Sequence, residues 1–303
     1  MNRPLTLYES ILEDKSLTND EIKIEWHKLC SYPAFENKRC FAGNNLLYHF
    51  MLDVLCQTQT NKGISIKSEA ESEERRQYWY KQMEKVQRSG TFAVRFMEVL
   101  RVCQVSINFF KPSIAKFLYK KYNAKSVLDP CAGWGGRLLG AAALDKVSYT
   151  GFDTNPLLIE PYRKMMKALF PHSKRVSESA EDMWASDLAT YKMIWSSSLD
   201  YPFETLTYDL VLTSPPYVNL ELYPGMTPFE SEKIFYEKFL IPLIDKCRKY
   251  CQTGGRVCFN ISPKMYAALT EKYNYKVCDE TVEMLQQIRF GKNKGDQIYV
   301  WNC

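Results

Sequence analysis

The chain has 303 residues, is 46% hydrophobic and carries a formal net charge of +5 at pH 7. This is the composition of a globular protein, long enough for one large α/β domain and a smaller attached region. Strong nucleic-acid binders concentrate more positive charge than this, so the mild basicity permits an anionic partner without requiring one.

Cysteine and histidine usage argues against several kinds of site. Ten cysteines occur without a CxxC pair, and the only histidines are His27, His49 and His172. This pattern favours reduced thiols over disulfides and disfavours a zinc site, so we expect no bound metal. The first residues lack the apolar core of a signal peptide, and no stretch has the ~18 continuous apolar residues of a membrane span. We therefore expect a soluble intracellular protein, cytoplasmic or nuclear according to its host, with no membrane partner.

The first third of the chain predicts helices. Residues 20–30, 44–56 and 92–107 repeat apolar side chains at positions i, i+3, i+4 and i+7. The polar stretch 57–74 lies between two of these helices and predicts an exposed loop. We expect residues 1–108 to form a helical region that precedes a second domain over residues 109–303.

Beyond Phe109, strands and helices alternate. Residues 125–144 and 146–170 each predict a strand, a turn and a helix, and residues 208–213 predict a third buried strand. A helix over 235–250 and a strand over 254–262 follow, and segments 275–285 and 296–303 predict an antiparallel pair. Near-continuous apolar strands separated by helices indicate an α/β fold whose mainly parallel sheet is covered on both faces.

A glycine-rich turn, Asp-Pro-Cys-Ala-Gly-Trp-Gly-Gly, follows the first of these strands from Asp129 to Gly136. In a doubly wound sheet this turn lies at the carboxyl edge, where ligands bind. Its spacing is neither the G-x-G-x-x-G of a dinucleotide fold nor that of a P-loop, and an acid at the strand end would repel a phosphate. The turn favours a cationic or amino-bearing ligand; the alternative is a tight turn that binds nothing.

The second strand ends in Asp153, within Gly-Phe-Asp-Thr-Asn-Pro. An acid at this point of a nucleotide-binding fold accepts hydrogen bonds from ribose hydroxyls. The alternative is an Asx-turn or a helix cap before Pro156, which is the commoner role of a single aspartate in such a position. The two acids and the glycines together favour the ligand interpretation.

The third strand ends in Ser214-Pro215-Pro216-Tyr217. An exocyclic amine of a nucleobase is a poor nucleophile. Acceptors such as the Ser214 hydroxyl and the Pro215 carbonyl would help by accepting hydrogen bonds from its N–H groups. The prolines stiffen the backbone, and Tyr217 offers a flat face for stacking a base that has left its duplex. The alternative is a rigid proline turn with Tyr217 packed in the core.

These elements together resemble the S-adenosylmethionine-dependent amino methyltransferases that modify nucleic-acid bases, which carry an (Asp/Asn/Ser)-Pro-Pro-(Tyr/Phe) motif after the fourth strand. Ser-Pro-Pro-Tyr is the form associated with N4-cytosine DNA methyltransferases, whereas Asp-Pro-Pro-Tyr is commoner in N6-adenine enzymes. The resemblance covers residues 108–303 and implies a Rossmann-like class I methyltransferase domain, with a mainly parallel seven-stranded sheet whose last strands are antiparallel. It implies S-adenosylmethionine as the cofactor and, as catalytic residues, Ser214, Pro215, Pro216 and Tyr217.

The same resemblance implies a set of cofactor-binding residues in four segments. They are Phe110, Lys111, Pro112 and Ser113; Asp129, Pro130, Cys131, Ala132, Gly133 and Gly135; Asp153, Thr154 and Asn155; and Ser179, Ala180 and Asp182. The sequence departs from the family pattern at Cys131, where the family often has Phe, and at Trp134–Gly136. It also departs at Ser179, where family members often have the Asp that lies near the adenine, which leaves Asp182 as the candidate for that contact.

The resemblance implies direct methyl transfer to N4 of cytosine in DNA, on a flipped-out or single-stranded base. Three alternatives stay open: an N6-adenine enzyme acting on DNA or RNA, a catalytically silent nucleic-acid-binding subunit, and methylation of a protein glutamine, whose enzymes usually have Asn in place of Ser214. The helical region 1–108 is the expected target-recognition part. The candidate phosphate contacts are Arg88, Arg95, Lys292 and Lys294. The alternative is that these side chains are simply solvated, as surface lysines and arginines usually are.

Overall fold

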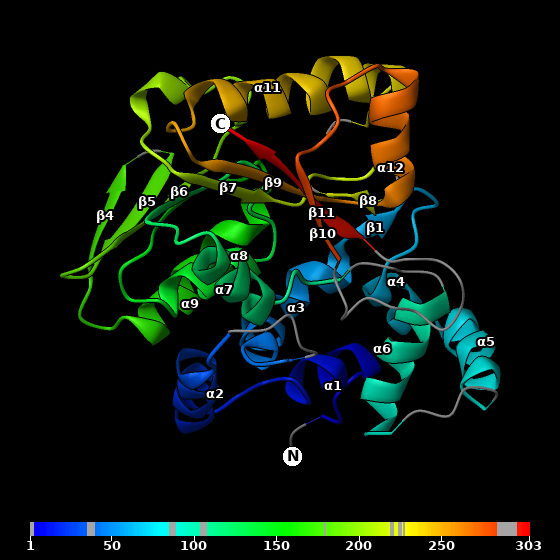
Figure 1. Cartoon of the computed structure of the whole chain (residues 1–303). Helices are drawn as coiled ribbons and strands as arrows, with labels where there is room; N and C mark the ends of the chain where they lie inside the picture. Colours follow the sequence, from blue (N-terminus) through cyan, green and yellow to red (C-terminus); the bar gives the residue numbers. More distant parts are fainter. Residues whose placement is uncertain are drawn as a thin grey trace.

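The computed structural model (Figure 1) describes most of the chain. The described residues are 3–34, 40–84, 89–103, 108–178, 180–218, 221–223, 226, 228–283 and 296–303. Four residues with predicted roles therefore lie outside the described part of the chain, namely Arg88, Ser179, Lys292 and Lys294. Within that part, no helix is both long and apolar enough to cross a membrane.

A mixed sheet forms the middle of the molecule, with nine strands among the described residues in the order β10-β11-β9-β7-β2-β3-β6-β5-β4 (Figure 1). The central strands run parallel: β2 (Ser126–Asp129), β3 (Ser148–Phe152), β6 (Thr190–Ile194), β7 (Leu210–Thr213) and β9 (Arg256–Ile261). Next to β9, the antiparallel β11 (Gln297–Asn302) pairs in turn with β10 (Glu280–Val282). The predicted Rossmann-like α/β fold, with its last strands antiparallel, is confirmed.

The sheet is larger than the seven strands expected. Beyond β6, a hairpin of β4 (Lys174–Glu178) and β5 (Glu181–Ala185) adds two antiparallel strands at the edge. Along β5, half-buried residues alternate with buried ones. Such strands lack the continuous apolar run of a parallel core strand, and the hydrophobic pattern of the sequence therefore did not predict them.

Helices cover both faces of the sheet because successive strand residues point to opposite sides. Val127 of β2 belongs to one buried cluster and Leu128 to the other. The first cluster packs under α7 (Pro112–Lys121), α8 (Gly136–Ala142) and α9 (Ile159–Leu169), and the second under α11 (Ile241–Tyr250) and α12 (Pro263–Ala267) (Figure 1). Short elements complete this framework: η1 (Pro156–Leu158), η2 (Phe203–Thr205), α10 (Glu232–Phe235), the π-helix η3 (Tyr236–Leu240) and η4 (Ala268–Lys272).

The first hundred residues are mainly helical, as predicted. The helices are α1 (Leu7–Glu13), α2 (Asn19–Ser31), α3 (Asn44–Gln57), α4 (Ile66–Glu71), α5 (Glu73–Met83) and α6 (Phe92–Cys103). The prediction of an exposed loop over 57–74 is wrong, because this stretch holds the short strand β1 (Gln59–Thr60) and α4. Ser65 caps α4 by accepting from the backbone N–H of Ser68, and Ile66 is fully buried.

The N-terminal helices pack directly on one face of the α/β domain and share a single hydrophobic core with it. The buried Lys116 of α7 strengthens this contact, since its ammonium donates to the carbonyls of Leu29 (2.8 Å) and Cys30 (2.7 Å) at the end of α2. A cation in this position satisfies the unpaired carbonyls of the helix terminus and matches its partial negative charge. A second link is the antiparallel pairing of β1 with β8 (Glu221–Leu222), which follows the Ser-Pro-Pro-Tyr segment.

Candidate active site

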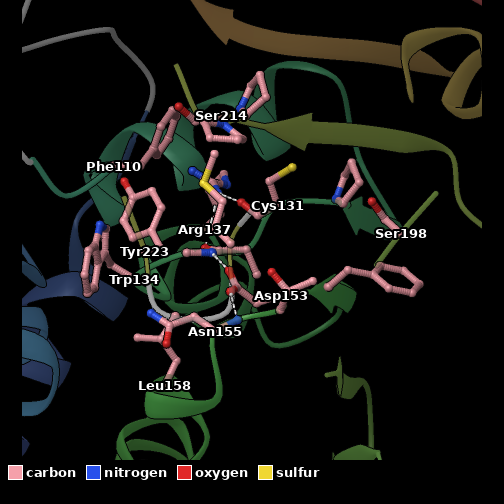
Figure 2. Close-up of a pocket in the computed structure, with 18 of the residues that line it drawn as sticks. Phe110, Cys131, Trp134, Arg137, Asp153, Asn155, Leu158, Ser198, Ser214 and Tyr223 are labelled. Carbon is pink, nitrogen blue, oxygen red and sulfur yellow. Dashed lines mark hydrogen bonds between the residues drawn. The ribbon is translucent and has the colours of Figure 1, made fainter. Parts of the chain in front are cut away.

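A cavity of about 280 Å³ lies at the carboxyl edge of the parallel strands, where β2, β3 and β7 end. Figure 2 shows Asn155 and Leu158 at one end of this cavity and Ser214 at the opposite end. Most of the predicted catalytic and cofactor-binding residues line it: Phe110, Pro130, Cys131, Ala132, Gly133, Asp153, Thr154, Asn155, Ser214, Pro215, Pro216 and Tyr217. Three turns that are far apart in sequence thus meet around one space.

The glycine-rich turn owes its shape to close backbone contacts. Gly133 and Gly135 have φ values of +55° and +79°, which side chains other than glycine rarely adopt. Gly136 begins α8, and a Cβ atom there would lie 1.9 Å from the carbonyl oxygen of Phe110. The backbone before α7 therefore presses against the turn and brings Phe110 to the cavity.

Asp129 stabilises the turn from inside the protein and does not line the cavity. Its side chain is fully buried, and its Oδ2 accepts from Nε of Arg137 at 2.6 Å and from the hydroxyl of Tyr149 at 2.6 Å. Arg137 also donates to the carbonyls of Cys131 and Ala132. Burial alone would lower the pKa of Arg137, but the adjacent Asp129 carboxylate raises it above its ordinary value. The charge of Asp129 is therefore compensated inside the protein, and it gives no argument for a cationic ligand.

Asp153 both shapes the second turn and lines the cavity. Its Oδ2 accepts from the N–H of Gly133 at 2.7 Å, and its Oδ1 accepts from the N–H of Asn155 at 2.9 Å, which is the Asx-turn expected as one alternative. Burial raises the pKa of this carboxyl to about 6, although both backbone hydrogen bonds act in the opposite direction. The carboxyl therefore loses its proton as the pH rises through about 6.

Asn155 contributes a buried polar atom that lacks a partner. Its Oδ1 accepts from the N–H of Leu157 and caps η1, while its Nδ2 has no hydrogen-bond partner within the described part of the chain. The residue is 2% exposed and lines the cavity. Because an unsatisfied buried donor costs free energy, this amide is suited to a ligand acceptor at this end of the cavity.

The Ser-Pro-Pro-Tyr segment forms the opposite end. The Ser214 hydroxyl accepts from Nδ2 of Asn260 at 3.1 Å and lies 3.4 Å from the backbone carbonyl of the same residue, to which it donates. Thr213, the last residue of β7, accepts from the N–H of Cys131 at 3.2 Å and so ties this end to the glycine-rich turn. Five aromatic residues also line the cavity: Tyr217, Tyr223, Phe229, Phe239 and Trp134.

Several predicted site residues lie away from the cavity. Lys111 is the N-cap of α7 and its ammonium lies over the ring of Phe41, Pro112 follows it, and the Ser113 hydroxyl donates to the Cys40 carbonyl. Gly135 is the N-cap of α8, where an added Cβ would meet Met165 rather than the cavity. Arg95 lies half-buried on α6.

The segment predicted near the adenine is also displaced. Ala180 lies in the turn between β4 and β5, and Asp182 is fully buried on β5, where it pairs with Nε of Arg163 at 3.0 Å and accepts from the Trp195 indole at 2.9 Å. The edge hairpin causes this displacement, because it places β5 two strands away from β3. The cavity is instead lined here by residues that follow β6, namely Ser196, Ser197 and Ser198.

Other cavity residues were missed by the sequence patterns. Arg137 and Asn260 are single polar residues among apolar neighbours, in the segments Arg-Leu-Leu-Gly and Cys-Phe-Asn-Ile. A polar side chain inside a predicted buried element is a usable signal, because such a group needs a specific partner. Trp134 and Tyr223 meet edge to face with ring centroids 5.9 Å apart, a contact between segments that spacing does not reveal.

In the described residues, no cluster of histidine, cysteine or acidic side chains is arranged to hold a metal ion. The fold and the cavity define a Rossmann-like α/β protein with a cavity at the carboxyl edge of its sheet, which is where ligands bind in folds of this kind.

No known family model matches the chain, and no curated protein matches it in sequence. Solved structures resemble the chain only at low similarity. A putative class I S-adenosylmethionine-dependent methyltransferase from Listeria monocytogenes is 13% identical, with 93% of this chain and 87% of that chain covered and a TM-score of 0.43. The tRNA (m1A58) methyltransferase TrmI from Aquifex aeolicus is 13% identical, with 64% and 69% covered and a TM-score of 0.40. Similarity this distant assigns neither an activity nor a substrate to the chain.

Proposed function

We propose that this protein is an S-adenosylmethionine-dependent methyltransferase that acts on the exocyclic amine of a nucleobase, with N4 of cytosine in DNA as the favoured target. One observation supports this proposal above the others: the glycine-rich turn, Asp153 and Ser-Pro-Pro-Tyr line the same cavity. The topology of a parallel sheet brings the three turns to one edge, and the acceptors that they present around the cavity are the groups that this chemistry needs.

The cavity residues fit the proposed cofactor at the end formed by the first two turns. The Asp153 carboxylate is an acceptor suited to ribose hydroxyls, and the partnerless Nδ2 of Asn155 is a donor suited to an acceptor atom of the nucleoside. Gly133 has no Cβ to obstruct close approach of a ligand to the backbone. When bound, S-adenosylmethionine supplies a methyl group activated by its sulfonium. We propose Asp153, Asn155 and residues 130–133 as the residues that hold its nucleoside part.

The chain's own residues would bind and orient the amine at the other end. Ser214 and the Pro215 carbonyl are fixed acceptors, since the two prolines restrict the backbone that presents them. Tyr217 and the neighbouring rings offer faces on which a base can stack, a contact worth ~1–3 kcal/mol in single-stranded nucleic-acid sites. A duplex base does not fit such a pocket, so the proposed substrate is a flipped-out or single-stranded base.

Cysteine attack on the base has no part in this proposal. The cysteine that lines the cavity, Cys131, is in the glycine-rich turn. Burial raises the pKa of its thiol above the ordinary value of 9.0, and the carboxylates of Asp129 and Asp153 act in the same direction. The reactive thiolate is therefore disfavoured, which is consistent with direct transfer to the amine.

Nucleoside mass spectrometry after incubation of DNA and of RNA with isotopically labelled S-adenosylmethionine tests the proposal. We expect labelled 4-methylcytosine from DNA, and turnover roughly 10²–10³-fold lower for Ser214→Ala, which loses one preorganised hydrogen-bonding group. Labelled 6-methyladenine would show that adenine is the target base, and a labelled RNA nucleoside would show that the substrate is RNA; either result would refute cytosine in DNA as the target. Without any labelled nucleoside and without a rise in melting temperature on adding S-adenosylmethionine, a silent binding subunit would be the better description.

A further inference from the structure

Asn260 is an amide between apolar neighbours on its strand. It lies on β9 and is 4% exposed, while its neighbours Phe259 and Ile261 are fully buried. Burying a carboxamide among apolar side chains is unfavourable unless its polar atoms find partners. Asn260 lines the cavity next to Ser214, and the two polar atoms of its side chain differ in whether they have a hydrogen-bond partner.

One of these atoms fixes the Ser214 hydroxyl. Asn260 Nδ2 donates to Ser214 Oγ at 3.1 Å, and Ser214 Oγ donates in turn to the Asn260 backbone carbonyl at 3.4 Å. A serine hydroxyl has one proton and two lone pairs. With the proton directed to a backbone carbonyl and one lone pair taken by Nδ2, the remaining lone pair is available to a ligand. Ser214 is thereby set as an acceptor and not as a donor.

The other atom supplies a second acceptor. Asn260 Oδ1 is buried and has no hydrogen-bond partner among the described residues, although Asn260 lines the cavity. The strand register explains why this side chain reaches Ser214. The last paired residue of β7 is Thr213, opposite Phe259, and the next residue on each strand is Ser214 and Asn260. Because two prolines follow, β7 does not extend its ladder, and the amide makes the contact there instead.

We propose that Asn260 is a positioning and specificity residue that makes this end of the cavity select an amino group over an oxo group on the target base; this rests on the proposed function. An exocyclic amine brings two N–H donors to the acceptors Ser214 Oγ and Asn260 Oδ1. An oxo group in the same place brings none, so both buried acceptors would stay unpaired. The site therefore takes cytosine in preference to uracil, and by the same chemistry adenine in preference to hypoxanthine.

Equilibrium binding in the presence of S-adenosylhomocysteine tests this inference without requiring turnover. The probes are oligodeoxycytidine and oligodeoxyuridine of equal length, with oligodeoxyadenosine and oligodeoxyinosine as a second pair. We expect the wild type to prefer the amino member of at least one pair. In Asn260→Ala that preference falls roughly tenfold, the equivalent of about one hydrogen bond, because binding of the amino oligomer weakens while binding of the oxo oligomer stays constant. Asn260→Leu, which keeps most of the volume, gives the same loss.

A double-mutant cycle with Ser214→Ala shows whether Asn260 acts through the serine. We expect Asn260→Ala/Ser214→Ala to lose more preference than either single variant, since both acceptors are then gone, but less than the sum of the two losses, because Asn260 also orients the Ser214 hydroxyl. Asn155→Asp is the matched control at the other end of the cavity: it keeps the cap on η1 and removes the partnerless donor. That variant should bind S-adenosylhomocysteine more weakly and keep its amino preference.

Each result separates the inference from the proposed function. Equal weakening of both members of a pair in the Asn260 variants would assign the residue a purely structural role. Additive losses in the cycle would remove the link to Ser214, and a wild type without any amino preference would overturn the inference outright. An intact amino preference with no labelled nucleoside in mass spectrometry would refute methyl transfer and leave the selectivity of the site standing.

Discussion

Gly136 gives a sharp test of how the cavity is built. In Gly136→Ala, the new Cβ would lie 1.9 Å from the Phe110 carbonyl oxygen, whereas ordinary contacts begin near 3.4 Å. The difference of these two distances, 1.5 Å, is the displacement needed to relieve the clash, and the obstacle is backbone that no rotamer change can move. Overpacking of a close-packed core typically costs about 1–3 kcal/mol or more.

The displacement also has a consequence for binding. Phe110 lines the cavity, so a shift of its backbone away from the turn deforms the wall. Misplacement of a functional group by ~1 Å costs roughly 10²-fold in the rate of a positioned reaction. We expect Gly136→Ala to lower the free energy of unfolding in urea by at least about 2 kcal/mol. We also expect it to weaken S-adenosylhomocysteine binding, measured by calorimetry, by roughly 10²-fold.

Gly254→Ala is the matched control. Gly254 has a φ of +82°, but a Cβ there meets no atom within 4 Å. The substitution therefore carries backbone strain of about 1–2 kcal/mol without a clash and lies outside the cavity. Wild-type stability and ligand affinity in Gly136→Ala would refute the argument that this glycine is required by the Phe110 carbonyl.

Three further predictions concern charges. Lys116→Met should lower the free energy of unfolding in urea by about 1–3 kcal/mol, because the carbonyls at the end of α2 lose their buried donor. Asp129→Asn should cost about 3–5 kcal/mol by leaving Arg137 buried without its counter-charge, and Asp129→Asn/Arg137→Met should recover part of that loss in the same assay. Because the pKa of Asp153 is raised to about 6, the carboxylate that would accept from the cofactor is lost as the pH falls through about 6. S-adenosylhomocysteine affinity by calorimetry should therefore rise with pH up to that value and then level off, and it should become independent of pH in this range in Asp153→Asn.

The overall fold was predictable because its signals are local. The apolar runs that became β2, β7 and β9, and the i, i+3, i+4 pattern of α2 and α3, are visible within single segments. The hairpin of β4 and β5 was not, since a strand such as Lys-Arg-Val-Ser-Glu has one strongly apolar residue and owes its structure to its partners. The β1 strand was missed for the same reason, since its pairing partner lies beyond residue 220.

Side-chain direction limited the prediction of the site. The order of motifs brought the glycine-rich turn, Asp153 and Ser214 to one edge, as the topology of a parallel sheet requires. Spacing did not reveal that Asp129 points into the protein toward Arg137, or that Asp182 pairs with Arg163 on an edge strand. Each of these acids pairs with an arginine that only the folded structure brings next to it. A pattern of residue types along the chain does not reveal such pairs.

The pairing of β1 with β8 limits how this protein can be re-engineered. β8 directly precedes Tyr223, whose ring packs against Trp134 in the cavity wall. A chimera that exchanged the N-terminal helices for those of another protein would leave the backbone of Glu221 and Leu222 without its hydrogen-bonding strand. The N-terminal part of this scaffold is therefore not an interchangeable module: any graft must bring its own strand to fit the segment that follows Ser-Pro-Pro-Tyr.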